Sequence, residues 1–225
     1  MDSLVTLASG NSHGPHGSHV GLPLEILAAL TLLALAPFVL VMTTSFVRIV
    51  VVLSLVRSAI GASSLPPNAV LTGLALVLTF VIMTPTIARV SHDAVDPYSH
   101  GAISQRVMLT RAFAPLREFM TRQTHVKDLA LFARIAREPN SAPDHATPEV
   151  LVPAFVVGEL RSAFAIGFAL YLPFVAIDLA VASILMGLGM FMLSPPIVSL
   201  PCKLLLFVMV DGWALVCGGI VSSFR

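Results

Sequence analysis

The sequence predicts an all-α membrane protein with two kinked helical hairpins, which supply about four apolar spans and are joined by a helical hydrophilic region. Two observations lead to this fold class. Of the 225 residues, 56% are hydrophobic and only 11% are charged, whereas soluble domains carry about 25% charged residues. The apolar residues also gather in runs that exceed the roughly 20 helical residues needed to cross a bilayer. We therefore expect four regions: a tail (1–21), a first hairpin (22–90), the hydrophilic region (91–153) and a second hairpin (154–225).

Charge and the N-terminal residues exclude some classes of protein. The net charge is +1 and no basic cluster is present, which argues against a nucleic-acid partner. No Lys or Arg precedes Arg48, so the basic start of a secretory signal peptide is missing and we expect the first apolar run to be retained. The tail contains His13, His16 and His19. A flexible tail lacks the fixed geometry of a metal site, so we predict no metal and no cofactor.

The first hairpin begins with an apolar run over residues 22–60. As one helix its 39 residues would be about 58 Å long, roughly twice a hydrocarbon core. The run must therefore tilt, kink near Pro37, split, or extend beyond the bilayer. Arg48 and Arg57 are nine residues apart and so lie on opposite helix faces, which means that one partner surface cannot satisfy both. Interfacial snorkelling and pairing between subunits both remain open for them.

A turn over residues 61–68 ends this run and leads to the second span. Pro66 and Pro67 stop the helix, and Asn68 is suited to cap the next one. Residues 69–88 then form the cleanest span, with no charged residue and with Pro85 near its exit. The two runs together form the first hairpin.

The hydrophilic region is predicted to be largely helical. We expect a loop over 91–101, a helix over 103–123 bent at Pro115, and a second helix capped by Thr124 with apolar residues mostly three apart. Its charges have mixed signs, as is typical of a solvated helix face. Four prolines predict an irregular connector over 140–153. Eight Lys and Arg residues over 89–153 favour the cytoplasm, but this rule weakens for loops of about 60 residues, so the side stays open.

The second hairpin contains charges inside two apolar runs, 155–193 and 197–221, which meet at Ser194-Pro195-Pro196. Ionised side chains are costly in hydrocarbon and normally face protein or a wet cavity. A two-helix hairpin has too little interior for all of them, so it should pack against other subunits or line a path. Glu159 and Arg161 are two residues apart and need separate partners. The charges are Glu159, Arg161, Asp178, Lys203 and Asp211.

No motif indicates catalysis, and we predict no catalytic residue. The sequence lacks a phosphate-binding glycine loop, HExxH, GxSxG and a Cys/His cluster. Structural or intersubunit pairing is the leading interpretation of the apolar-segment carboxylates, with a proton relay or an aspartyl site as alternatives. Met186, Met190 and Met192 precede the Pro-Pro turn, where flexible thioethers suit either core filling or a hydrophobic collar.

Several motifs resemble the R subunit of the type III secretion export gate, the SctR/FliP family. The resemblance spans about residues 22–222. The motifs include Leu65-Pro66-Pro67-Asn68, Pro115-Leu116-Arg117-Glu118-Phe119-Met120, Pro153-Ala154-Phe155, Ser199-Leu200-Pro201 and Val210-Asp211-Gly212-Trp213.

This resemblance implies a non-enzymatic subunit of a protein-export pore in the bacterial inner membrane. Family members form pentamer-like assemblies of several copies with the small subunits S and T, beside the large export protein V, and unfolded substrate proteins pass through. The hydrophilic region lies on the periplasmic side in the family. The missing signal peptide resembles injectisome members, which serve virulence. A stand-alone multispanning transporter and an intramembrane enzyme are the alternatives.

The resemblance also assigns roles to particular residues. Met190, Phe191 and Met192 correspond to a methionine-rich pore gasket, although flagellar relatives commonly have consecutive methionines where Phe191 stands. Charged residues within the helices are expected to hold subunits together. These are Arg48, Arg57, Glu159, Arg161, Asp178, Lys203 and Asp211.

Overall fold

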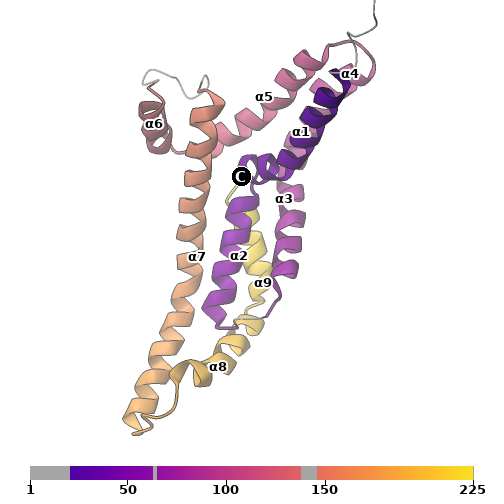
Figure 1. Cartoon of the computed structure of the whole chain (residues 1–225). Coiled ribbons are helices and arrows are strands. Elements are labelled where there is room, and N and C mark those ends of the chain that lie inside the picture. The colour runs from indigo at the N-terminus through magenta and orange to yellow at the C-terminus, as the bar shows by residue number, and fades with distance from the viewer. Residues whose placement is uncertain (1–20, 63–64, 138–145, 225) are drawn as a thin grey trace, which may run out of the picture. The chain divides into compact units, whose positions relative to one another are not determined.

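The computed structural model describes residues 21–62, 65–137 and 146–224, and in these ranges every regular element is a helix (Figure 1). The all-α prediction is confirmed. The chain divides into two compact units, residues 1–39 and 40–225. The first unit contains most of helix α1 (Gly21–Thr43), and the second contains all later helices. The three histidines of the predicted tail lie outside the described residues.

The first apolar run splits instead of forming one helix. Helix α1 continues through Pro37 and ends at Thr43, and α2 (Phe46–Ile60) begins after Ser45. At the break, the Thr44 hydroxyl donates a hydrogen bond of 2.7 Å to the Leu40 carbonyl, one turn earlier in the chain. This local bond lets a polar residue interrupt the run without leaving its hydroxyl unpaired. The split was one of the four alternatives for this over-long run.

The second span is longer than the sequence predicted. Helix α3 (Asn68–Val90) covers the predicted run, and a π-helical turn η1 (Ser91–Val95) and α4 (Asp96–Ser99) extend it. The predicted loop over 91–101 is therefore wrong for most of its length. Chain direction changes only near Gly101, whose φ of +69° suits glycine. The predicted Asn68 cap is also wrong, because Pro67 holds the N-cap position and the Asn68 side chain binds Arg57.

The hydrophilic region forms α5 (Gln105–Gln123), with Pro115 inside it, and α6 (Val126–Ile135). Thr124 was predicted to cap α6, but it does not. Its hydroxyl instead donates to the Met120 carbonyl at 2.7 Å. Strict spacing by three also drifts off a helix face that repeats every 3.6 residues. Val126 and Ile135 are consequently 75% and 66% exposed, and the buried face of α6 consists of Asp128, Leu129 and Ala133.

The last part of the chain forms one long helix and a bent pair. Helix α7 (Pro148–Gly187) begins at Pro148, because a first-turn proline gives up no helical hydrogen bond. The predicted irregular connector is thus wrong from residue 148 onward, while 138–145 lie outside the described residues. Helices α8 (Pro195–Met209) and α9 (Gly212–Ser222) meet at 64°. Asp211 stands at their junction with a left-handed backbone, φ 50° and ψ 54°.

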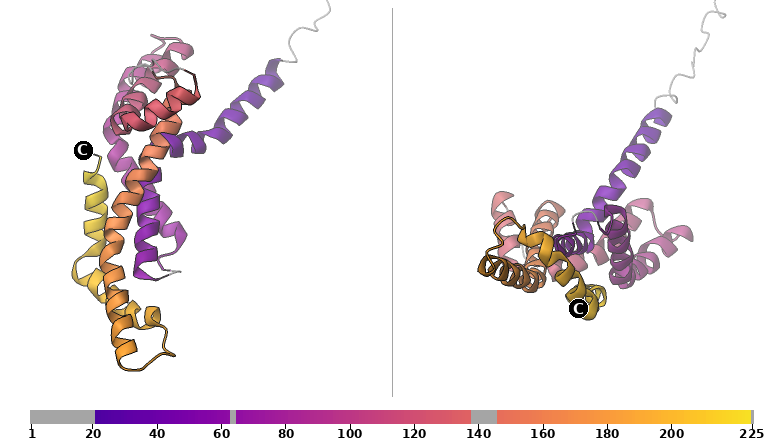
Figure 2. Two further views of the ribbon diagram at one scale, coloured as in Figure 1. Left: turned by 90° about the vertical axis from the view of Figure 1, so that its left-hand side faces the viewer. Right: turned by 90° about the horizontal axis from the view of Figure 1, so that it is seen from below.

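Two hydrophobic clusters organise the second unit, in which α2 lies along α7 (Figures 1 and 2). The α2 core joins α2, α3, α7, α8 and α9. The α5–α6 core joins α3, α5 and α6 to the first turns of α7. Phe224 packs against the α5–α6 core and also against the α2 core. Fully buried members of the α2 core are Ile49, Val52, Leu53, Ala75, Ala163 and Ile220, and those of the α5–α6 core are Met120, Val150, Leu151, Ala154 and Phe155.

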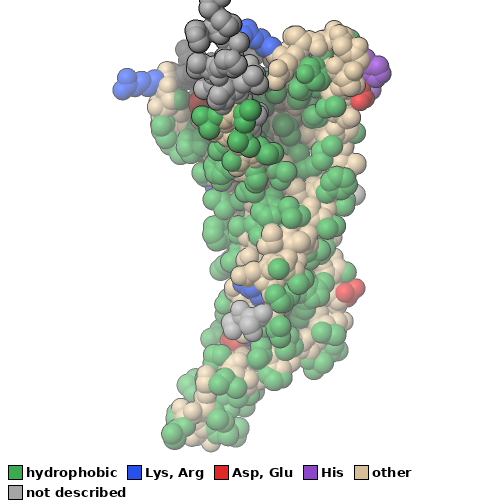
Figure 3. Space-filling model, turned by 45° about the vertical axis from the view of Figure 1, so that its right-hand side comes forward, with side chains coloured by type: hydrophobic (Ala, Val, Ile, Leu, Met, Phe, Trp, Pro, Cys, Tyr) green, Lys and Arg blue, Asp and Glu red, His purple; other side chains and the backbone are tan. Residues whose placement is uncertain are grey.

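Apolar side chains also cover much of the surface. One face of the space-filling view consists mostly of hydrophobic side chains with few charges (Figure 3). Two described helices, Asn68–Ser99 and Pro148–Gly187, are long and apolar enough to cross a membrane, and the number rises to four if each bent pair counts as one span. Only 28% and 11% of their most apolar windows are buried inside the chain. The expected multi-span character is confirmed, and these faces require an apolar environment.

Candidate functional site

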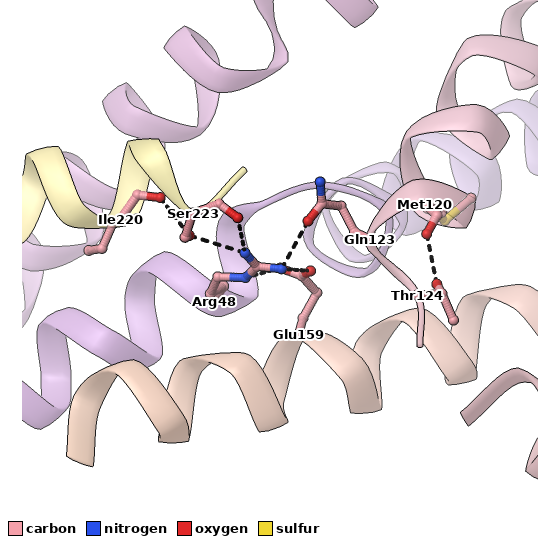
Figure 4. Close-up of polar contacts among 7 residues, drawn as sticks. All are labelled: Arg48, Met120, Gln123, Thr124, Glu159, Ile220 and Ser223. Carbon is pink, nitrogen blue, oxygen red and sulfur yellow. Dashed lines mark hydrogen bonds and ion pairs between the residues drawn. The ribbon is translucent and has the colours of Figure 1, made fainter. Parts of the chain in front are cut away.

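The most buried ion pair among the described residues joins α2 to α7. Arg48 and Glu159 are 3% and 0% exposed. The pair is bidentate, with the Arg48 Nη2 2.5 Å from Glu159 Oε1 and the Nε 3.0 Å from Oε2 (Figure 4). A planar guanidinium matches a carboxylate in this geometry, so the pair fixes both the distance and the rotation of α2 relative to α7.

Residues from two further elements complete the surroundings of Arg48. Its Nη2 also donates to the Gln123 Oε1 at 3.2 Å, and its Nη1 donates to the Ser223 carbonyl and hydroxyl, both at 3.1 Å (Figure 4). All five guanidinium N–H groups can therefore find an acceptor. The Phe224 ring lies 3.8 Å from the Arg48 Cζ. We call Arg48, Gln123, Glu159, Ser223 and Phe224 the Arg48 network.

A second ion pair joins α7 to α6. The Arg161 Nη2 donates to the Asp128 Oδ1 at 2.6 Å. The Asp128 side chain is 3% exposed while that of Arg161 is 52% exposed, so the arginine reaches inward to a buried carboxylate. The second Asp128 oxygen, Oδ2, is buried without a hydrogen bond. Glu159 and Arg161 thus have different partners, as their spacing requires.

A third cluster lies near the other end of α7. The Lys203 ammonium donates to the Asp178 Oδ2 at 2.6 Å and to the Ala59 carbonyl at 3.2 Å. The Ser199 hydroxyl donates to the Asp178 Oδ1 at 2.5 Å. Ser199 and Lys203 are four residues apart and share one face of α8. This Lys203 network (Ala59, Asp178, Ser199 and Lys203) links α2, α7 and α8.

The two remaining predicted charges have no ion pair among the described residues. The Arg57 Nη1 donates to the Asn68 Oδ1 and to the Pro66 carbonyl, and so ties α2 to the start of α3. Asp211 is exposed at the bend between α8 and α9. The other five predicted charges have ion-pair partners inside this chain. Their pairing between subunits stays a prediction.

The predicted gasket residues lie in the turn between α7 and α8. Met190, Phe191 and Met192 are 44%, 80% and 101% exposed. Their turn starts at Gly189, whose φ is +74°. Exposure of this size is unusual for such side chains in one chain by itself, so this tip is available to neighbours.

The networks include residues that sequence reasoning missed. Asp128 was assigned to a solvated face, but it is one of the three buried residues of α6 and pairs with Arg161 of α7. Ser199 could have been found from its four-residue spacing to Lys203. Gln123, Ser223 and Phe224 carry no comparable signal. In the described part of the chain, no group of three or more His, Cys, Asp or Glu side chains is arranged to hold a metal ion.

Comparisons with known proteins give a consistent result. The model of the FliP family matches residues 29–220. The flagellar biosynthetic protein FliP of Pectobacterium carotovorum is 51% identical over 204 residues, which cover 90% of this chain and 79% of that protein. The protein of the same name from Bacillus subtilis is 46% identical, covering 92% and 94%, and that from Caulobacter vibrioides is 49% identical, covering 89% and 76%.

Proposed function

Since the chain belongs to the FliP family, we propose that it is a core, non-enzymatic subunit of a type III protein export gate. In this proposal several copies surround a pore in the bacterial inner membrane. Unfolded substrate proteins cross through that pore. The family assignment and the multi-span fold are the premise, and the pore role is the proposal built on them.

The exposed tip between α7 and α8 is the observation that carries this proposal. Met190, Phe191 and Met192 are apolar, adjacent and at least 44% exposed. Copies arranged around an axis would bring these side chains together as a collar that excludes water. Flexible thioethers can repack around a passing chain of changing shape and close again behind it. A seal that opens for protein and resists ions needs this combination.

The uncovered faces of the helices support obligate partners. The most apolar window of α7 is only 11% buried in the chain. We propose that further copies, in a pentamer-like arrangement, and subunits of the S and T types cover part of it, beside the large export protein V. The predicted intersubunit charges would then act at the edges of these contacts. The hydrophilic region, now α5 and α6, is proposed to lie on the periplasmic side.

Substitution of the gasket methionines tests the gate. Membranes containing the assembled complex with Met190→Ala and Met192→Ala should leak ions more than those with the unsubstituted complex. Met209→Ala is the control, because this methionine is also exposed, at 75%, but lies at the far end of α8, outside the tip. Unchanged leakage in an assembled complex would contradict the gasket role.

Copurification separates the gate from the alternatives. A gate subunit should recover S- and T-type subunits in stoichiometric amounts from cells that produce them. A stand-alone transporter would instead show solute flux when the purified chain alone is reconstituted. An intramembrane enzyme would lose turnover after one carboxylate substitution without any change in assembly.

The type of secretion system is a separate part of the proposal. The named relatives are flagellar proteins, which favours a flagellar export apparatus. The absence of Lys and Arg before Arg48 was the ground for expecting an injectisome. Deletion of the gene distinguishes them. Loss of swimming supports the flagellar assignment, whereas loss of effector secretion with normal swimming supports the injectisome.

A further inference from the structure

An open hollow of about 640 Å³ lies beside the Arg48 network. It is bordered by the end of α5, the start of α6, one turn of α7 and the residue after α9. Nine of its ten lining residues have polar or charged side chains. The lining residues are Arg48, Arg122, Gln123, Thr124, His125, Val126, Lys127, Arg161, Ser162 and Ser223.

The hollow has an excess of positive charge. Arg48 and Arg161 are neutralised by Glu159 and Asp128. Arg122 and Lys127 have no ion-pair partner in the described part of the chain, and both are exposed. The uncompensated charge is therefore two positive groups facing one hollow, on a chain whose net charge is only +1. Such a site attracts an anion with several acceptor oxygens.

The hollow lies where the exposed apolar face of α7 begins, because residues 150–160 are buried or half-buried and Phe164 is the first exposed apolar side chain after them. After Arg161, residues 162–177 contain no charged side chain. On the other side, α5 and α6 carry the hydrophilic region. Basic side chains at the border between an apolar span and a polar domain stand at the depth of lipid phosphates, and basic pockets between membrane helices bind anionic headgroups.

An exposed apolar stripe runs from this hollow along α7. Phe164, Phe168 and Leu172 are 56%, 66% and 52% exposed. Their spacing of four, starting three residues after Arg161, places them below Arg161 on the same helical face. An anion with an attached hydrocarbon chain would thus find charge at one end and apolar surface along its length. A free phosphate or a carboxylate would use only the first.

We propose that this hollow binds the phosphate of an anionic phospholipid, with its acyl chains along the Phe164–Phe168–Leu172 face of α7. Arg122 and Lys127 supply the uncompensated charge, and Arg161 borders both the headgroup and the stripe. The site does not depend on the pore role, because it uses none of the tip residues. Lipid at this position would support the junction of α5, α6 and α7.

Binding of short-chain lipids to the purified full-length chain in detergent tests this site. Dioctanoyl phosphatidylglycerol should bind at least tenfold more tightly than dioctanoyl phosphatidylcholine, and inorganic phosphate at the same concentration should not displace it. Arg122→Gln with Lys127→Gln should weaken phosphatidylglycerol binding about twenty-fivefold, taking about fivefold for each cation near an anionic group. Arg111→Gln with Arg134→Gln is the matched control, since it removes one exposed cation from each of the same helices outside the hollow.

Four outcomes would overturn the proposal. Equal binding of the two lipids would show that the hollow does not distinguish an anionic headgroup from a zwitterionic one. Equal weakening by the control pair would show diffuse attraction instead of a site. Displacement by inorganic phosphate would identify a free-anion site. Binding to the single chain but not to the assembled complex would show that a neighbouring subunit occupies the hollow. Thermal unfolding of both double variants verifies that they are folded, which is expected because all four side chains are exposed.

Discussion

Arg48 is held by more partners than any other charged side chain described here. Its guanidinium contacts Glu159, Gln123 and Ser223, and stacks on Phe224. A buried pair often stabilises no more than an apolar pair of the same volume, because both ions lose hydration. Its main effect is therefore specificity: the bidentate geometry accepts one register of α2 on α7. Removing one partner alone is costly, since the other charge stays buried.

We predict that Glu159→Gln lowers the free energy of unfolding by about 3–5 kcal/mol, the usual cost of leaving a buried charge without its partner. The measurement is chemical unfolding of the full chain in detergent. The matched control is Glu118→Gln, because Glu118 forms an ion pair of similar length, 2.6 Å, with Arg89, but both side chains are at least 41% exposed. The control should change stability by about 1 kcal/mol or less.

A second variant makes this prediction sharper. In Arg48→Met with Glu159→Leu, no buried charge is left unpaired, so the double variant should be more stable than Glu159→Gln alone. If the double variant were the less stable of the two, the ion pair itself would be strongly stabilising and the account above would be wrong.

At the scale of elements, α2 and α7 approach closely at one glycine. A Cβ placed on Gly167 would collide with the Leu55 Cδ1 and lie 3.1 Å from the Leu55 Cβ. A rotamer change moves the Cδ1 away but not the Cβ, so the two backbones would have to separate. Glycine is therefore required here by packing, and its position two turns beyond Glu159 reinforces the register set by the ion pair.

We predict that Gly167→Ala destabilises the chain by about 1–3 kcal/mol through overpacking, despite alanine's better helix propensity. Gly73→Ala in α3 is the control, because nothing lies within 4 Å of the added methyl group. That variant should be neutral or more stable by up to about 1 kcal/mol. Unfolding measured for both variants in the same detergent compares them directly, and equal effects would contradict the close-packing explanation.

The Lys203 network acts at the same scale, at the junction of α7 and α8. Lys203 is 5% exposed, whereas the Asp178 side chain is 34% exposed. The buried member of a pair depends more on its partner, because water can solvate the exposed one. Asp178→Asn should thus destabilise the chain more than Lys203→Met, which removes the buried charge and leaves a carboxylate that Ser199 and solvent still satisfy. Thermal unfolding of the two variants tests this order, and the reverse order would contradict it.

At the scale of the whole second unit, Phe224 packs against both hydrophobic clusters, as Ile82 of α3 also does, and it lies on Arg48. Its ring stacks with Phe119 of the α5–α6 core at 6.3 Å between centroids. The helices α3 and α7 also run from one cluster to the other. Phe224 adds a contact from beyond the end of α9, so its loss should weaken the cooperation between the two clusters.

We predict that Phe224→Ala costs about 2–4 kcal/mol and separates unfolding of the α5–α6 core from that of the α2 core. Hydrogen exchange resolved along the chain should show α5 and α6 losing protection before α2. Phe191→Ala is the control, because that ring is 80% exposed in the single chain and its loss should leave protection in both cores unchanged. One cooperative transition in Phe224→Ala would contradict the separation.

Sequence patterns predicted the positions of the helices in the chain better than they predicted which residues of different helices contact each other. The uncharged run over 69–88 identified α3 to within two residues at each end, because composition and length suffice for a span. Arg48 and Glu159 were both singled out, but they are 111 residues apart, and a sequence does not give the register between two helices. The prediction that Thr124 caps α6 failed for a different reason. A threonine hydroxyl can cap the next helix or bind the preceding turn, and tertiary packing selects between these. The burial of Asp128 likewise depends on the docking of α6 on α7.

The position of Ser223 in the sequence means that the members of the Arg48 network are synthesised at different times. Ser223 follows Arg48 by 175 residues, and a ribosome that adds 5–20 residues per second takes roughly 9–35 s to make that length. During this interval the Arg48 guanidinium has been synthesised but its Ser223 acceptors have not. The Arg48 network therefore remains incomplete until the turn that contains Ser223 has been synthesised, and chaperones and partner subunits have that period in which to engage the chain.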